Sequence, residues 1–227
     1  MKIDSFIFNW KGHEANAHAL ELKIGKFTKV TVINSEEHLR DKHPGWAHLN
    51  DQAYFSAQWN EACRLFDGDI LFHIQADAHF DQFEALFAKV RSLFQKYPIG
   101  VYEPNIDYTS IRYNKLRLRA VEPDLLEVPK TDCTCWFISK DIVKQLPLVD
   151  VTVNKYGWGI PRVIAALSHL SGRRCVRDYN VTIRHPKGRG YSTEEAKLHL
   201  RNYIESLDPE IKQEISRIDR ISDQLAP

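Results

Sequence analysis

The sequence predicts an α/β fold with a mostly parallel central sheet, completed by helices at the C-terminus. Strand-type and helix-type patterns alternate along the first half of the chain, and this alternation is typical of parallel strands joined by right-handed crossover helices. The chain has 227 residues, of which 43% are hydrophobic. It is therefore long enough to bury a sizeable core as one domain.

Six elements are predicted before Pro98. β-branched and aromatic residues mark three strands, and apolar residues at helical spacing mark three helices. The strands are expected at residues 2–8, 27–33 and 69–74, and the helices at 12–24, 53–66 and 81–95. The last of these helices has the clearest apolar face, formed by Phe83, Leu86, Phe87, Val90 and Leu93. We expect this face to pack on the sheet.

Beyond Pro98 the pattern changes to shorter extended pieces followed by helices. Extended segments are expected near Val101, at 108–113, 117–121 and 134–139, and near Arg174 and Val181, with a helix at 161–171. The final segment is charged and amphipathic, and Asp208-Pro209 divides it into two helices. We expect a main domain over residues 1–192 and a helical extension over residues 193–227. The apolar side of that extension should dock on the main domain or on a second copy of the chain.

Composition and charge exclude several classes of protein. The formal net charge is +1, so no overall field favours a nucleic acid or a membrane surface as partner. The longest apolar run, at residues 163–167, is far too short to span a membrane. Polar residues close to the start leave no signal-peptide core. We expect a cytoplasmic protein with no nucleic-acid partner and no transmembrane segment.

The cysteines and tryptophans are expected to be structural. Four cysteines are too few for a disulfide framework. Cys133 and Cys135 lie in an apolar stretch with no second pair at zinc-ligand spacing, so they should be buried strand thiols. Trp46, Trp59 and Trp136 should lie in the core, because tryptophan buries a large apolar area.

Polar side chains follow three of the predicted strands, at the points where the strands end. Asn9 ends the first strand and Asn34 the second, while Asp77 and His79 follow the third. Ligands of open α/β sheets bind at these carboxyl ends. The asparagines suit a base or ribose, and a carboxylate with an imidazole suits Mn²⁺ or Mg²⁺. Because no glycine-rich phosphate loop follows the first strand, a phosphate-bearing ligand would need such a metal to offset its charge.

Asn60, the pair Gly68-Asp69 and Asp77 lie on and around the third strand. Their spacing resembles that of the inverting GT-A-fold glycosyltransferases of family 2. Those enzymes carry an Asn, then a Gly-Asp pair, then a hydrophobic strand that ends in Asp-x-Asp. Asn60, Gly68 and Asp69 match the first part of this pattern. Asp77 matches the second Asp of the motif, whereas Gln75 replaces the first. By order of elements the resemblance extends over residues 2–190, and its specific part is confined to residues 59–81.

The resemblance also implies roles for residues near the C-terminal end of the main domain. Arg184-His185-Pro186 looks like the family element whose His completes the metal site or contacts the diphosphate. Asp77, His79 and His185 would then hold the cation. Lys187 and Arg189, in the glycine-containing loop that follows, would stabilise the departing diphosphate.

The remaining donor contacts are implied in the same way. Asn9, Asn34 and Asn60 would contact the nucleotide-sugar, together with Asp77. Trp158 lies in the aromatic and glycine segment 156–159, which would form a platform for the sugar ring.

One position departs from the family pattern in a way that affects catalysis. Family members place an acidic pair, whose Asp is the general base, at the start of a helix and eleven residues before a Gly. Counting back from Gly172 leads to Pro161, which cannot accept a proton. An inverting transfer needs a carboxylate within reach of the acceptor hydroxyl. Asp132 is therefore the candidate base, and Asp150 is the reserve.

These observations favour a glycosyltransferase that uses a nucleotide-sugar donor, a glycan or lipid-linked acceptor, and Mn²⁺ or Mg²⁺. The resemblance implies polysaccharide, lipopolysaccharide or capsule synthesis, a setting compatible with peripheral membrane association and with homo-oligomers formed through the C-terminal helices. Three alternatives stay open. A retaining transferase would need no inverting base, and a non-catalytic sugar- or nucleotide-binding domain would explain Gln75 and Pro161. A nucleotidyltransferase shares the parallel start of the sheet, but the glycine-rich, lysine-bearing loop that this chemistry usually places after the first strand is absent there.

Overall fold

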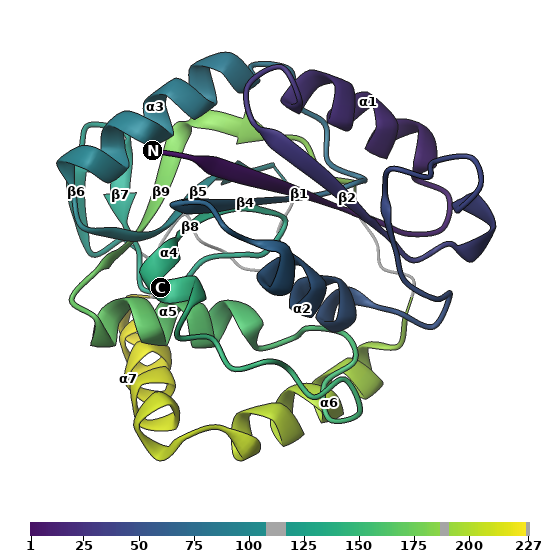
Figure 1. The fold of residues 1–227 in the computed structure, drawn as a ribbon. Coiled ribbons are helices and arrows are strands. Elements are labelled where there is room, and N and C mark those ends of the chain that lie inside the picture. The colour runs from purple at the N-terminus through teal and green to yellow at the C-terminus, as the bar shows by residue number, and fades with distance from the viewer. Residues whose placement is uncertain (108–116, 187–190, 226–227) are drawn as a thin grey trace.

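A single mixed sheet with helices on both faces forms the body of the protein (Figure 1). The computed structural model describes residues 1–107, 117–186 and 191–225. Its elements as far as residue 106 are β1 (Ile3–Asn9), α1 (Glu14–Ile24), β2 (Lys29–Asn34), η1 (Glu37–Leu39), β3 (Ala47–His48), α2 (Phe55–Leu65), β4 (Ile70–Gln75), α3 (Phe83–Lys96) and β5 (Ile99–Ile106). The later elements are β6 (Arg119–Glu122), β7 (Leu125–Glu127), β8 (Cys135–Ser139), α4 (Lys140–Val143), α5 (Ile160–Leu170), β9 (Arg174–Ile183), α6 (Thr193–Ser206) and α7 (Pro209–Leu225).

The strand order in the sheet is β3-β2-β1-β4-β8-β5-β9-β7-β6. The first four strands are parallel to one another, and β5 is parallel to β9. β8 lies between β4 and β5 and runs antiparallel to both, and the β7 pairings are antiparallel as well. The α/β fold is thus confirmed, while the expectation of a mostly parallel sheet holds for its N-terminal half alone. The extended segment predicted at 134–139 is β8, but an antiparallel strand needs no crossover helix, so the helix–strand alternation does not indicate its place between β4 and β5.

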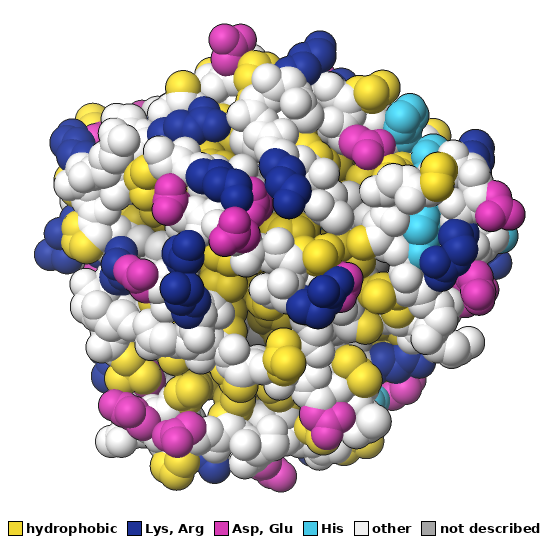
Figure 2. All heavy atoms as spheres, in the orientation of Figure 1, with side chains coloured by type: hydrophobic (Ala, Val, Ile, Leu, Met, Phe, Trp, Pro, Cys, Tyr) yellow, Lys and Arg dark blue, Asp and Glu magenta, His cyan; other side chains and the backbone are white. Residues whose placement is uncertain are grey.

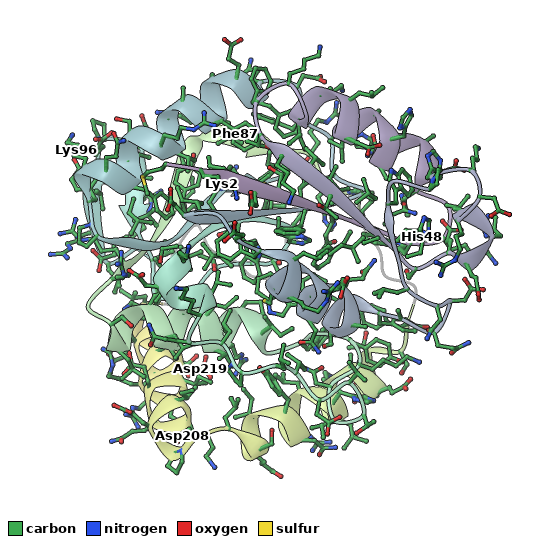
Figure 3. All side chains as sticks on the ribbon, in the orientation of Figure 1. Lys2, His48, Phe87, Lys96, Asp208 and Asp219 are labelled. Carbon is green, nitrogen blue, oxygen red and sulfur yellow. The ribbon has the colours of Figure 1, made fainter. Side chains whose placement is uncertain are left out.

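Helices cover both faces of the sheet. α1 and α3 lie on one face, α2, α4 and α5 lie on the other, and α6 and α7 lie below α5 (Figure 1). The apolar face predicted for α3 is confirmed, because all five of its residues are buried. Phe87 points from α3 toward the sheet (Figure 3), where its ring centroid lies 5.2 Å from that of Phe72.

The six elements predicted before Pro98 are confirmed, each within about three residues of its expected ends. The two extended pieces expected near Arg174 and Val181 are one strand, β9, whose register against β5 shifts after Pro104. Such a bulge bends a strand, and the polar residues there mimic a strand end. The segment expected at 108–113 lies outside the described residues. β3, β7 and α4 were not predicted, because elements of two to four residues show no periodicity.

The break predicted at Asp208-Pro209 separates α6 from α7. Ile215 and Ile218 on α7 are buried, and α7 packs along α5. The apolar side of the C-terminal segment therefore docks on the body of the same chain. α6 also packs against the body, at the residue before α5. A Cβ added at Gly159 would lie 2.8 Å from a methyl carbon of Leu200 on α6.

The structural expectations for tryptophan and cysteine largely hold. Trp46, Trp59 and Trp136 are buried, as predicted. Cys135 is buried in β8, whereas Cys133 precedes that strand and is partly exposed. On the face drawn in Figure 2, Lys and Arg are interspersed with Asp and Glu, in line with the net charge of +1. Among the helices of the described residues, none combines the length and the apolar content needed to cross a membrane.

Candidate functional site

A cavity of about 990 Å³ opens at the carboxyl ends of β1, β2 and β4. This is where the sheet topology predicts a ligand site. Its walls come from segments that are far apart in the sequence. The lining residues lie within 10–13, at 35, within 51–58, 75–77, 130–133 and 156–162, and at 186, 191 and 200.

Asp77 lies in this cavity, just beyond the end of β4. The backbone of the preceding residue is held in place, since the N–H of Ala76 donates to the carbonyl of Phe8 at 3.0 Å. Asp77 Oδ2 lies 3.3 Å from His185 Nε2. Asp77 Oδ1 is buried and has no hydrogen-bond partner within the described part of the chain. A buried carboxylate oxygen without a partner is costly, so this oxygen marks a position at which a ligand would be stabilised.

Backbone pairing brings His185 to Asp77. The N–H of His79 donates to the carbonyl of Arg184 at 2.8 Å, and the N–H of Arg184 donates back at 3.1 Å. The N–H of His185 also donates to Asp107 Oδ1 at 2.7 Å. His79 thus joins the two loops through its backbone, while its side chain is exposed.

The predicted three-residue metal site is assembled only in part. Asp77 and His185 meet, but within residues 1–107, 117–186 and 191–225 no three His, Cys, Asp or Glu side chains are grouped so that they could hold a metal ion. The prediction of His79 as a third ligand is therefore not met by this structure, because its backbone takes the bridging role and its ring faces solvent.

Asp132, the candidate base, lines the same cavity. Its Oδ1 accepts a hydrogen bond of 2.6 Å from the N–H of Cys133. Its own N–H donates to Glu103 Oε1 at 2.6 Å, and Glu103 Oε2 accepts from Arg177 Nε at 3.1 Å. Glu103 and Arg177 are both buried, and burial raises the pKa of Glu103 to about 8. The sequence analysis did not find this pair, because its members are 74 residues apart and no motif joins them.

An aromatic wall lies in the same cavity, and Trp158 belongs to it. Trp158 Nε1 donates to the hydroxyl of Tyr191 at 2.9 Å, and the Tyr191 ring stacks on Tyr156 with centroids 4.5 Å apart. Gly157 and Gly159 flank Trp158 with φ of 77° and 98°, a backbone that favours glycine. Burial raises the pKa of Tyr156 to about 12, so its phenol stays neutral at physiological pH.

Both departures from the family motif face the cavity. Pro161 stands in the first turn of α5, where its fixed φ suits a helix start, and it lines the cavity together with Arg162. Gln75 lines the cavity next to Asp77. The positions at which the resemblance implied carboxylates are therefore occupied by neutral side chains that face the cavity.

Asn9 and Asn34 lie under the cavity instead of lining it. Both are fully buried, and Asn9 Nδ2 donates to Asn34 Oδ1 at 2.8 Å. Ser35 and Gln58 line the cavity above them, and each donates to the carbonyl of Asn9. Any contact of the asparagines with a nucleoside would thus run through Ser35 and Gln58. The position of Ser35 directly after a strand was the available sequence signal, whereas nothing in the sequence marked Gln58.

Asn60 and Asp150 lie away from the cavity. The Asn60 side chain donates to the carbonyl of Val149 at 2.8 Å and accepts from its N–H at 2.9 Å, so it fastens α2 to the segment after α4. Asp150 accepts from the N–H and hydroxyl of Thr152 in an exposed turn. Lys187 and Arg189, the predicted diphosphate contacts, lie outside the described residues.

Comparison with known proteins identifies the fold. No family model matches the sequence, and no curated protein matches it. Glucosyl-3-phosphoglycerate synthase from Mycobacterium tuberculosis superposes with a TM-score of 0.57 at 13% identity, over 95% of this chain and 80% of that one. S. aureus TarS gives 0.59 at 11% identity, over 99% of this chain and 71% of the other. GalNAc-T7 superposes with a TM-score of 0.62 at 14% identity, over 99% of this chain and 54% of that one.

The chain has the GT-A fold. This confirms the fold implied by the sequence resemblance. The solved structures hold nucleotide ligands: the synthase with Mn²⁺, UDP-glucose and phosphoglyceric acid, TarS with UDP-GlcNAc, and GalNAc-T7 with UDP, GalNAc and Mn²⁺. At 11–14% identity the likeness extends to the fold alone.

Proposed function

We propose that the protein is a glycosyltransferase that moves a sugar from a nucleotide-diphosphate donor to an acceptor hydroxyl. The observation that carries this proposal is Asp77, which lies at the strand-end cavity of a GT-A fold with a buried carboxylate oxygen unpartnered among the described residues. The three structural neighbours named above were each solved with a nucleotide or nucleotide-sugar bound.

Two of the described residues, Asp77 and His185, would serve as ligands of a divalent cation, and the donor diphosphate would supply further oxygens. Asp77 offers one unpartnered oxygen, and the imidazole of His185 lies beside its other oxygen. An oxygen and nitrogen donor set suits Mn²⁺ or Mg²⁺, the ions held by structures of the mycobacterial synthase. When bound, the metal would offset the negative charge of the departing diphosphate. Lys187 and Arg189 are proposed to assist from the loop that follows His185.

The other cavity residues have distinct proposed roles. Trp158, which is partly exposed and lines the cavity, would offer the ring face on which a sugar packs. Asp132 would accept the proton of the acceptor hydroxyl as the new bond to the anomeric carbon forms and the bond to the diphosphate oxygen breaks. Glu103, which binds the Asp132 backbone, would act as a positioning residue. Asn9 and Asn34 would hold Ser35 and Gln58 against the nucleoside. Asn60 would have a structural role, because it joins α2 to the backbone of Val149.

The biological setting is part of the same proposal. A glycan or lipid-linked acceptor, in polysaccharide, lipopolysaccharide or capsule synthesis, follows from the sequence resemblance. The composition favours a cytoplasmic location, such synthesis is compatible with peripheral association with a membrane, and the C-terminal helices are where homo-oligomers would form.

A second candidate is a non-catalytic sugar- or nucleotide-binding domain. One observation favours it: Gln75 and Pro161 both face the cavity, at the positions where the resemblance implies carboxylates. A domain that binds a nucleotide-sugar without cleaving it would need neither group.

Calorimetric titration tests the proposal. A panel of nucleoside diphosphates and nucleotide-sugars is titrated into the protein with Mn²⁺ and with EDTA. One nucleotide should bind in a cation-dependent way, and Asp77→Asn should abolish that dependence. Asp81→Asn is the matched control, because Asp81 lies in the same loop but is exposed and pairs with Lys23.

Each result has a defined meaning. Cation-dependent binding retained by Asp77→Asn would remove the metal assignment, and no binding across the panel would contradict the donor site. Donor turnover separates an enzyme from the binding domain. The anomeric configuration of the product then separates an inverting from a retaining transfer.

A further inference from the structure

Three basic side chains line the cavity, Lys11, Lys130 and Arg162, and the last two share one carboxylate partner. Lys130 precedes Asp132 by two residues in the loop before β8, and Arg162 stands in the first turn of α5. The sequence analysis did not single out either residue. Neither belongs to the strand-end group around Asp77, so they define a second charged part of the cavity, here called the basic pair.

A carboxylate from the C-terminal helix holds the basic pair in place. Lys130 Nζ lies 3.1 Å from Asp219 Oδ1, and Arg162 Nη1 lies 2.9 Å from Asp219 Oδ2. Asp219 projects from α7 where that helix passes α5 (Figure 3). No other ion pair joins either cation to a carboxylate within the described part of the chain. One negative charge thus faces two positive charges, and the group as a whole is cationic.

The surroundings add to this positive charge. The N-terminal end of an α-helix carries a partial positive charge, and α5 begins at this side of the cavity without a side-chain cap. Pro161 fills the position at which a carboxylate was implied, so no acidic side chain from that turn opposes Arg162. The side chain of Lys130 is 16% exposed and that of Arg162 39% exposed. Both can therefore be reached from the cavity while α7 restricts their motion.

We infer that the basic pair binds an anionic group, a phosphate or a carboxylate, carried by the acceptor. This inference rests on the proposed function and adds the chemical class of its acceptor. Guanidinium and ammonium donors form strong charge-assisted hydrogen bonds to both kinds of anion. An acceptor held here by its anionic group would present a hydroxyl near Asp132, two residues along the chain from Lys130.

Asp219 then has a definite part in the affinity. It occupies donors on Lys130 and Arg162 that an anion would use, so it orders the pair and competes with the ligand. Removing a cation and removing Asp219 both break the same ion-pair group, but they change the net charge in opposite directions. Anion affinity should therefore fall when a cation is removed and rise when Asp219 is removed. If the ion pairs were purely structural, the two changes would shift anion affinity in the same direction or not at all.

The experiment measures binding of glucose 6-phosphate, glucuronate and neutral glucose to the full chain by calorimetry, without nucleotide. Arg162→Gln should weaken binding of the anionic sugars about tenfold, the size of one lost charge-assisted hydrogen bond. Asp219→Asn should strengthen it severalfold. Glu214→Gln is the matched control on α7, since Glu214 pairs with Arg217 and does not line the cavity. Urea unfolding of all three variants reports their stability.

The outcomes are distinguishable. Opposite shifts in the two variants, with Glu214→Gln unchanged, support the inference, and preference for glucose 6-phosphate or for glucuronate names the anion. Equal binding of glucose and the anionic sugars, or weaker anion binding in both variants, would show that Asp219 only fastens α7 and would overturn it. Failure of the proposed function appears elsewhere, as loss of nucleotide binding in the Asp77 titrations.

Discussion

Gly157→Ala is expected to destabilise the protein and to displace the cavity wall beside Trp158. Gly157 has a φ of 77°, and a Cβ there would lie 2.3 Å from Cδ1 of Phe55. A left-handed backbone costs a non-glycine residue about 1–2 kcal/mol. Forcing Phe55 out of its packed position adds about 1–3 kcal/mol. The smaller entropy of the unfolded Ala variant returns about 0.4–1 kcal/mol. The net loss of unfolding free energy is therefore about 1–5 kcal/mol.

Two other glycines separate these contributions. Gly172 has a φ of 65° and no atom within 4 Å of the added Cβ, so Gly172→Ala tests backbone strain alone. Gly45 has open space and no positive φ, so Gly45→Ala tests the entropy of the unfolded chain. In urea unfolding followed by circular dichroism, stability should decrease in the order Gly45→Ala, Gly172→Ala, Gly157→Ala.

The comparison can refute the reasoning at two points. If Gly157→Ala costs no more than Gly172→Ala, Phe55 does not pack against Gly157. If both behave like Gly45→Ala, neither backbone is left-handed. Phe55 also lines the cavity, so nucleotide affinity should fall in Gly157→Ala and stay unchanged in Gly172→Ala.

Three further outcomes are expected. Burial lowers the pKa of His73 from 6.5 to about 3, so the unfolded chain binds the proton more tightly and the unfolding free energy should fall as pH drops below 6.5. In His73→Phe, the unfolding free energy measured by urea titration should change less as the pH drops below 6.5. Burial raises the pKa of Glu103 from 4.5 to about 8, so stability should instead fall as pH rises through this range, and a slope that survives in Glu103→Gln would contradict the assignment. Asn60→Ala should lose about 2 kcal/mol, for two hydrogen bonds, with nucleotide affinity intact. Normal stability with lost nucleotide binding would instead place Asn60 in the donor site.

Part of the candidate site could be predicted because its signals are local. Asp77 follows a mostly apolar strand, and Trp158 stands between two glycines with positive φ. Both line the cavity, as does Asp132. The structure differs from the predictions that depended on the direction of a side chain. His79 uses its backbone and turns its ring to solvent, and Asn60 hydrogen-bonds a backbone 89 residues away.

The sequence by itself determined the order and approximate ends of the helices and strands before Pro98, and the break between α6 and α7. Helical and strand periodicity, glycine and proline act over a few residues, so they can be read without knowing the neighbours in space. Tertiary structure decided the insertion of β8 between β4 and β5, and the pairing of Asp219 with Lys130 and Arg162. It also decided which polar residues are buried. These features depend on contacts between segments dozens of residues apart, and their energies arise only once packing has removed water from between the partners.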